Sequence, residues 1–176
     1  MNSLNQHLFL LLNADAQASA FSICAGRTLA EWPVPIALLL VAIACYRQND
    51  RKRFALRTVL GTALAMGLAL AIRCTFYNPR PFVLGLGRML IEHDATTSFP
   101  SLHATFLFSL ALPLVAQNGA RGTAIAVLLL GLAVAWARIF VGVHYPFDMA
   151  GAFMIAGIAA VAACAVFKQR APKWRE

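Results

Sequence analysis

The sequence predicts an all-α fold, a polytopic transmembrane helix bundle. Of its 176 residues, 60% are apolar and 12% are charged, and the mean hydropathy is +0.69. Soluble domains carry about 25% charged residues, so the composition excludes a disordered chain and does not fit an ordinary soluble domain. An apolar run of about 20 residues crosses the hydrocarbon core of a bilayer. The chain has room for five or six such runs but not for a second, soluble domain.

Five apolar runs are predicted to span the membrane. The first, 28–46, opens with Glu31, Pro33 and Pro35, and proline is tolerated in the first turn of a helix. The last two runs are rich in Gly and Ala, which let helix backbones approach closely in lipid. The remaining four runs are 54–76, 102–117, 122–141 and 148–167.

Two terminal segments flank the predicted membrane core, 27–167. Residues 1–26 contain an apolar LFLLL stretch that Asn13 and Asp15 interrupt. This pattern fits an interfacial or hairpin-like helical element, which we favour, or a sixth span. Residues 168–176 form a basic tail, expected in the cytoplasm.

Basic residues, which produce the net charge of +8, lie mainly between the apolar runs. If the 47–57 loop is cytoplasmic, alternation of the spans puts ten of the fifteen basic residues on the same side, as the positive-inside rule requires. The 74–101 loop and the 139–147 turn then lie on the outer face. A nucleic-acid partner is not expected, because it would need a folded basic face with aromatic side chains.

Three arginines on the predicted outer face indicate a phosphate site. Arg73, Arg80 and Arg138 come from separate segments and would repel one another unless an anion lay among them. The guanidinium group binds phosphate oxygens in a bidentate manner. For any one arginine alone, contact with lipid headgroups is the alternative interpretation.

The segment FPSLHA opens the third predicted span. Ser101 stands at the N-cap position, and the free N–H groups that follow an N-cap attract anions. His103, in the first turn, would lie beside a bound phosphate and could pass a proton to a leaving oxygen. Simple helix capping by Ser101 is the alternative.

His144 and Asp148 are four residues apart at the start of the last span. A carboxylate that accepts from one imidazole nitrogen leaves the other with a free lone pair, so His144 is a candidate nucleophile. Asp148 could also cap its own helix. No metal or cofactor is expected, because the three arginines repel a dication and already supply the positive charge that phosphoryl transfer needs. A serine hydrolase is disfavoured, because Ser101 lacks a strand-and-elbow context.

Together these segments resemble the three-part signature of the type 2 phosphatidic acid phosphatase superfamily. The first motif of that signature is a basic residue, six further residues, and then Arg-Pro. The second motif is Pro-Ser-x-His. The third is an arginine, five further residues, a histidine, three further residues and an aspartate. Here the motifs fall at Arg73 and Arg80-Pro81, at Pro100-Ser101-Leu102-His103, and at Arg138, His144 and Asp148.

Three departures from the family pattern bear on substrate preference and rate rather than on reaction type. Arg73 stands where lysine is usual, which keeps the charge but alters the geometry. Leu102 replaces a usual Gly or Asp, and Ala137 replaces a serine that often precedes the third-motif arginine.

The resemblance implies a catalytic role for each matched residue. His144 attacks phosphorus and forms a phosphohistidine, Asp148 orients His144, and His103 protonates the leaving group. No metal takes part. The phosphate is held by Arg73, Arg80, Ser101 and Arg138.

Within the superfamily, the chain looks most like bacterial undecaprenyl-diphosphate phosphatases of the bacitracin-resistance type, which recycle the lipid carrier of cell-wall synthesis. This implies a polyprenyl diphosphate or other phospholipid as substrate, membrane lipids as surroundings, and the bacterial inner membrane as location, with the site on the outer face. Glu92, His93 and Asp94 are candidates for recognising the diphosphate, or form a solvated loop.

Two alternatives stay open. A phosphatase of phosphatidylglycerophosphate, phosphatidate or lipid A would use the same residues. A transporter or lipid-binding protein without turnover is disfavoured, because transporters place polar groups near the bilayer midplane, whereas the polar residues here lie at span ends. The sequence makes no prediction about oligomeric state.

Overall fold

The computed structural model describes residues 3–117 and 119–167, and this part of the chain is helical without strands. The predicted all-α class is confirmed. The basic tail, 168–176, lies outside the described residues. The elements are α1 (Ser3–Leu12), α2 (Ala20–Glu31), α3 (Pro33–Tyr46), α4 (Arg51–Thr75), the short 3-10 helix η1 (Pro81–Leu84), α5 (Leu102–Val115), α6 (Arg121–Phe140) and α7 (Pro146–Val166).

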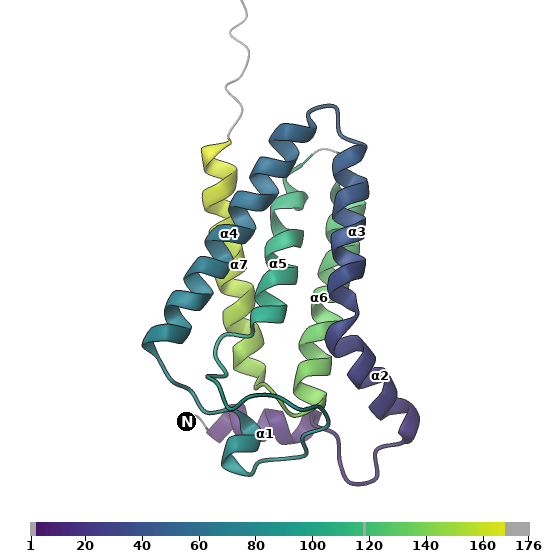
Figure 1. The fold of residues 1–176 in the computed structure, drawn as a ribbon, viewed down its shortest axis with the longest axis vertical. Coiled ribbons are helices and arrows are strands. Elements are labelled where there is room, and N and C mark those ends of the chain that lie inside the picture. The colour runs from purple at the N-terminus through teal and green to yellow at the C-terminus, as the bar shows by residue number, and fades with distance from the viewer. Residues whose placement is uncertain (1–2, 118, 168–176) are drawn as a thin grey trace, which may run out of the picture.

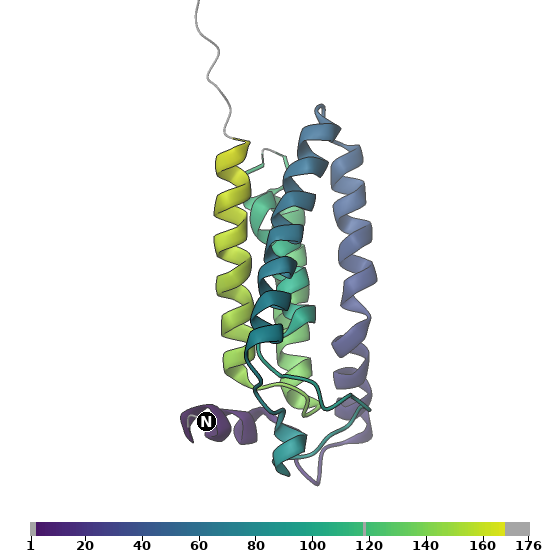
Figure 2. The ribbon, with the colours of Figure 1, turned by 60° about the vertical axis from the view of Figure 1, so that its left-hand side comes forward.

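Helix α5 lies at the centre of a bundle that α3, α4, α6 and α7 complete (Figures 1 and 2). Nine of its 14 residues are buried. Small residues on the neighbouring helices allow this close packing: a Cβ at Gly131 of α6 would lie 2.9 Å from the ring of Phe108, and one at Gly61 of α4 would lie 3.0 Å from Pro113. The lower end of α5 lies above those of α6 and α7 in Figure 1, because the preceding loop occupies that space.

The predicted count of five spans is not confirmed. Helices α4, α6 and α7, with 25, 20 and 21 residues, are long and apolar enough to cross a bilayer, and α2 with α3 forms a fourth candidate that is bent by 46°. Helix α5 is apolar but has 14 residues, fewer than the roughly 20 that a span needs.

The predicted first span, 28–46, is wrong at its start. The helical chain begins at Ala20, after Ser19 accepts a hydrogen bond from the N–H of Ser22 (3.1 Å), and it breaks at Trp32. Pro33 and Pro35 lack the N–H groups that would continue the ladder of α2, so Pro33 instead opens α3. The predicted boundary between residues 26 and 27 therefore falls inside α2.

Helix α1 lies crosswise under the bundle (Figure 2). Its ten residues cover about 15 Å, half of what a span needs, which favours the interfacial element over a sixth span. The ring of Phe9 packs edge-on against Tyr145, with 5.5 Å between ring centroids. The Asn5 side chain accepts a hydrogen bond from the N–H of Phe147 (3.0 Å), so α1 is attached to the start of α7.

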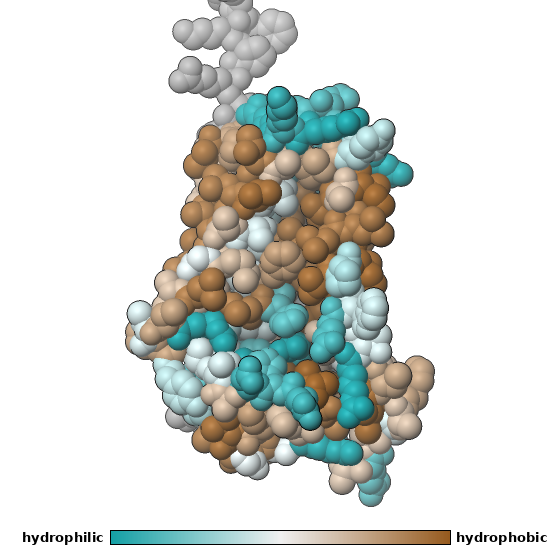
Figure 3. Space-filling model, viewed as in Figure 1, coloured by the Kyte–Doolittle hydropathy of each residue, from teal (hydrophilic) through white to brown (hydrophobic). Residues whose placement is uncertain are grey.

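Apolar surface covers most of the bundle's length in Figure 3. Exposed side chains such as Leu39, Val59, Ile125 and Val161 form this belt. One end carries a hydrophilic cap over the α3–α4 loop, and a second hydrophilic patch lies near the opposite end. Such a belt faces lipid in a membrane protein.

Candidate active site

The loop between α4 and α5 and the turn between α6 and α7 meet at one end of the bundle, opposite the α3–α4 loop (Figure 1). The turn depends on Gly142, whose φ of 84° favours glycine, and a Cβ there would overlap the carbonyl oxygen of Arg88. Because of these two connections, the three motif segments converge as the sequence predicted.

His144 is almost completely buried and lies between a carboxylate and a guanidinium group. Its Nδ1 is 3.1 Å from Oδ2 of Asp148, and its Nε2 is 3.1 Å from Nη1 of Arg80. A carboxylate only accepts and a guanidinium only donates, so these partners assign the proton to Nδ1 and a lone pair to Nε2. Burial lowers the pKa of His144 to about 3, despite the opposing effect of Asp148, so the imidazole is neutral near pH 7.

Asp148 both orients His144 and caps its own helix, the two roles that the sequence suggested. Its Oδ2 accepts from the backbone N–H of Tyr145 (2.8 Å) and from the hydroxyl of Ser98, in addition to His144. Its Oδ1 is buried and has no hydrogen-bond partner among the described residues. The imidazole is thus held through a single carboxylate oxygen.

Arg80 is buried and is fixed by two backbone carbonyls. Its Nη1 donates to Val143 (2.7 Å) and its Nε to Thr96 (3.1 Å). Burial, followed by the charges of Arg73 and Arg138, lowers the pKa of Arg80 to about 10. The guanidinium stays protonated near pH 7, and Arg80 is subject to the predicted repulsion from the other two arginines.

Arg73, in the last turn of α4, points toward the same segment of loop. Its Nη1 donates to the carbonyl of Pro100 (3.1 Å), and its Nη2 lies 3.4 Å from the hydroxyl oxygen of Thr96. The same hydroxyl lies 3.3 Å from Nη2 of Arg80. Thr96 therefore brings the two arginines of the first motif together.

Ser101 and Arg138 hold buried polar atoms that the described residues leave without partners: Oγ of Ser101 and Nε of Arg138. The alternative of simple helix capping by the Ser101 side chain is not supported. Ser101 does occupy the N-cap position, and its carbonyl accepts from the N–H of Thr105 (2.9 Å), but its hydroxyl makes no cap bond. An unpaired buried polar group costs stability, and an anionic ligand with several oxygens would remove that cost here.

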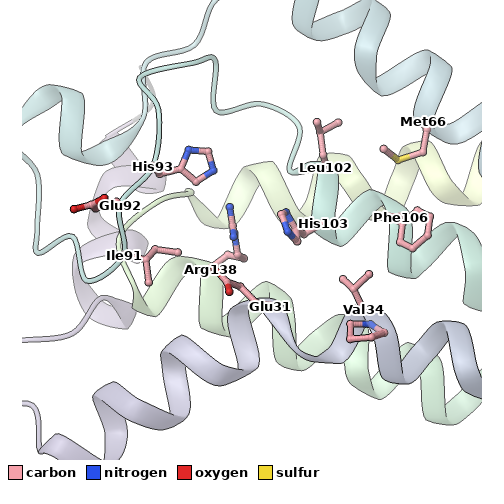
Figure 4. A pocket seen from close by; sticks show the side chains of 11 residues that line it. Glu31, Val34, Met66, Ile91, Glu92, His93, Leu102, His103, Phe106 and Arg138 are labelled. Carbon is pink, nitrogen blue, oxygen red and sulfur yellow. The ribbon is translucent and has the colours of Figure 1, made fainter.

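A cleft of about 630 Å³ opens beside these groups. Figure 4 shows the side chains of His93, His103 and Arg138 reaching one space within it, with Glu31 next to Arg138. Glu92 also lines the cleft, whereas Asp94 is exposed and does not.

His93, of the 92–94 group, lies beside the nucleophile candidate. The centroids of the His93 and His144 rings are 6.4 Å apart. Burial and the charge of Arg80 lower the pKa of His93, which makes the ring a neutral hydrogen-bonding group. Of the three recognition candidates, Glu92 and His93 are in a position to meet a headgroup.

Sequence reasoning missed three residues of this site: Glu31, Thr96 and Ser98. Glu31 ends α2 at the break, and a carboxylate inside an apolar run was the available signal. Thr96 and Ser98 belong to a short polar stretch before the second motif, which carried no recognisable spacing. Within 3–117 and 119–167, no group of three or more His, Cys, Asp or Glu side chains is arranged to hold a metal.

The sequence pattern of the PAP2 superfamily matches residues 54–172, well over half of the chain. The chain belongs to the PAP2 superfamily. The resemblance predicted from the three motifs is thereby confirmed, and with the apolar helices it supports a multi-pass PAP2-type membrane lipid phosphatase.

Two relatives of the chain are named for an activity on a polyprenyl diphosphate. YbjG of Escherichia coli (strain K12), provisionally named an undecaprenyl-diphosphatase, is 26% identical over 164 residues, 93% of this chain and 82% of the relative. Undecaprenyl-diphosphatase BcrC of Bacillus subtilis (strain 168) is 30% identical over 123 residues, 70% of this chain and 63% of the relative.

Two solved structures share the fold. The crystal structure of Aquifex aeolicus LpxE has a TM-score of 0.76 at 21% identity, covering 93% of this chain and 96% of that one. A PAP2-type phosphatidylglycerolphosphate phosphatase from Bacillus subtilis has a TM-score of 0.72 at 15% identity, covering 98% of this chain and 88% of that one. At these identities the likeness concerns the fold alone.

Proposed function

We propose that this PAP2 protein hydrolyses undecaprenyl diphosphate to undecaprenyl phosphate and phosphate, and so recycles the lipid carrier of cell-wall synthesis. The observation that carries the proposal is the buried His144, whose Nδ1 faces Asp148 while Nε2 faces the guanidinium of Arg80. The names of the relatives YbjG and BcrC support the choice of substrate.

In the first step the Nε2 lone pair of His144 attacks the terminal phosphorus. An oxygen of that phosphate replaces Nε2 as the acceptor for Arg80, which frees the lone pair. The bond between phosphorus and the bridging oxygen breaks, and His103 gives its proton to that oxygen. Arg73, Arg138 and Ser101 hold the transferred group, whose charge is stabilised by groups already in place.

In the second step water attacks the phosphohistidine. His103 takes a proton from the water, the bond between phosphorus and Nε2 breaks, and inorganic phosphate leaves. Asp148 keeps the Nδ1 proton on His144 throughout. No cofactor takes part in the proposed reaction, because the arginines and histidines provide the charge and the proton transfers.

A lipid substrate is supported by an apolar groove of about 480 Å³ among α3, α4 and α5. Met66 and Phe106 line both this groove and the cleft that holds His103. The rest of the groove is lined by side chains such as Val41, Val59 and Leu110. An apolar tail lying there would place its phosphate headgroup in the cleft.

We place the site on the outer face of the bacterial inner membrane. The α3–α4 loop, which contains Arg47 and leads into Arg51 and Lys52 at the start of α4, lies at the opposite end of the bundle. The positive-inside rule assigns such a basic segment to the cytoplasm. The headgroup of a lipid in the outer leaflet would then reach the cleft while its tail stays in the bilayer.

The test is phosphate release by the purified, detergent-solubilised protein in EDTA. The substrates are undecaprenyl diphosphate, phosphatidate, phosphatidylglycerophosphate and lipid A. We expect metal-independent release, fastest from the polyprenyl diphosphate. A preference for one of the other lipids would contradict the lipid-carrier role but not the mechanism, whereas lack of turnover on all four would favour binding or transport.

Filling the groove should weaken the use of long-tailed substrates. Ala63 of α4 is exposed and lines the groove. We expect Ala63→Trp to raise KM for undecaprenyl diphosphate about tenfold, which corresponds to a loss of about 1.4 kcal/mol of apolar contact between tail and groove. Turnover of a short-chain phosphatidate should be unchanged.

The matched control for the groove is Ala162→Trp, which adds the same side chain at an exposed position of α7 outside the groove. It should leave both substrates unaffected. An equal effect of the two substitutions, or an Ala63→Trp defect that is the same for short and long tails, would contradict a tail in this groove.

A further inference from the structure

Ser98 lies where all three motif segments meet. Its side chain is fully buried, its backbone N–H donates to the carbonyl of Asn78 (2.7 Å), and its own carbonyl is 3.4 Å from Nη1 of Arg73. Its hydroxyl contacts both members of the His144–Asp148 pair. The backbone of Ser98 is thus fixed by the loop of the first motif while its side chain reaches the third.

The proton positions at Ser98 follow from its partners. Oδ2 of Asp148 only accepts, so the hydroxyl must donate to it. The hydroxyl oxygen then turns a lone pair toward Nδ1 of His144, at 3.4 Å. Both contacts favour the state in which Asp148 is a carboxylate and Nδ1 carries the proton.

Asp148 depends on Ser98 for its orientation because its other oxygen is not held. Oδ1 is buried without a hydrogen-bond partner among the described residues, so all donors to the carboxylate converge on Oδ2. Two of these, Tyr145 and His144, come from the turn that precedes Asp148, whereas Ser98 comes from a separate segment. Without the hydroxyl, the carboxylate could rotate and offer its oxygens to Nδ1 in a different geometry.

We infer that Ser98 is a positioning residue for the phosphatase reaction: its hydroxyl fixes the Asp148 carboxylate and thereby keeps the proton of His144 on Nδ1 and the lone pair on Nε2. This inference rests on the proposed function, because it assigns Ser98 an action through the nucleophile of that reaction. Ser98 does not itself contact the substrate.

The test is Ser98→Ala. We expect kcat to fall about tenfold, the effect of losing one hydrogen bond to a charged group, with KM unchanged because the arginines remain. Nitrogen NMR of the 15N-histidine-labelled protein reports the tautomer directly, and the His144 signals are assigned by their loss in His144→Asn. The Nδ1-protonated fraction of His144 should fall in Ser98→Ala.

Two further variants separate the hydroxyl from the volume it fills. Ser98→Thr keeps the donor and should restore kcat and the tautomer, whereas Ser98→Cys fills nearly the same space with a weak donor and should behave like Ser98→Ala. The matched control is Ser109→Ala, which removes another fully buried serine hydroxyl whose bond goes to the carbonyl of Phe106 (2.7 Å). It should leave kcat and the tautomer unchanged.

An unchanged kcat in Ser98→Ala, a rise in KM alone, or a fall in kcat with an unchanged tautomer would each overturn the inference. The NMR result does not require turnover. If the wild type released phosphate from no lipid while the tautomer still depended on Ser98, the proposed function would fail and the positioning of His144 would stand.

Discussion

Phosphate release should fall at least about 1,000-fold in His144→Ala, the scale on which removal of a nucleophile acts. The variant lacks the Nε2 lone pair that attacks phosphorus, and the water that replaces it is not oriented by Asp148. Initial rates with undecaprenyl diphosphate, beside lipid binding measured in the same detergent, check this expectation. Binding should persist, because Arg73, Arg80 and Arg138 are still present.

His144→Asn guards against a folding defect from the cavity that alanine leaves, because it keeps a polar side chain beside Asp148. The matched control is His7→Ala, an exposed histidine of α1, which should keep the wild-type rate. Reactions with substrate labelled at the terminal phosphate, quenched with an alkaline denaturant because the phosphorus–nitrogen bond of phosphohistidine is acid-labile, should show label on the wild-type protein and none on the His144 variants. Label that survives in His144→Asn would assign the nucleophile to another residue.

Arg138→Lys should lower kcat/KM about 100-fold, which is the loss expected when one preorganised donor to the transition state is removed. Lysine keeps the positive charge but cannot bind two phosphate oxygens with a planar fork. The fold should tolerate the change, because Nε of Arg138 has no hydrogen-bond partner in the described protein. The measurement is kcat/KM for phosphate release, beside the unfolding temperature in detergent.

Arg121→Lys is the matched control, since Arg121 is exposed at the other end of α6. It should leave kcat/KM unchanged. Activity near the wild-type level in Arg138→Lys would contradict a bidentate phosphate contact. A large fall in unfolding temperature would instead assign Arg138 a structural role.

The sequence by itself determined the helical class and the contact between His144 and Asp148, because both depend on local or fixed spacing. Apolar runs near the length of a bilayer predict helices whatever their neighbours. His144 lies just before α7 and Asp148 lies in its first turn, so their separation of four residues keeps the two side chains in local contact, and that pair was predictable without a tertiary structure.

Only the tertiary structure decided where the helices begin and end and which residues support the His144–Asp148 pair. The break at Trp32 places Glu31 in the cleft, although composition alone suggested an uninterrupted span from residue 28. The hydroxyl of Ser101 does not cap α5, and Ser98 reaches Asp148 across 50 positions of the chain. Such contacts join segments that are distant in sequence, and no periodicity along the chain records them, because they exist only once helices have packed and loops have closed over the site.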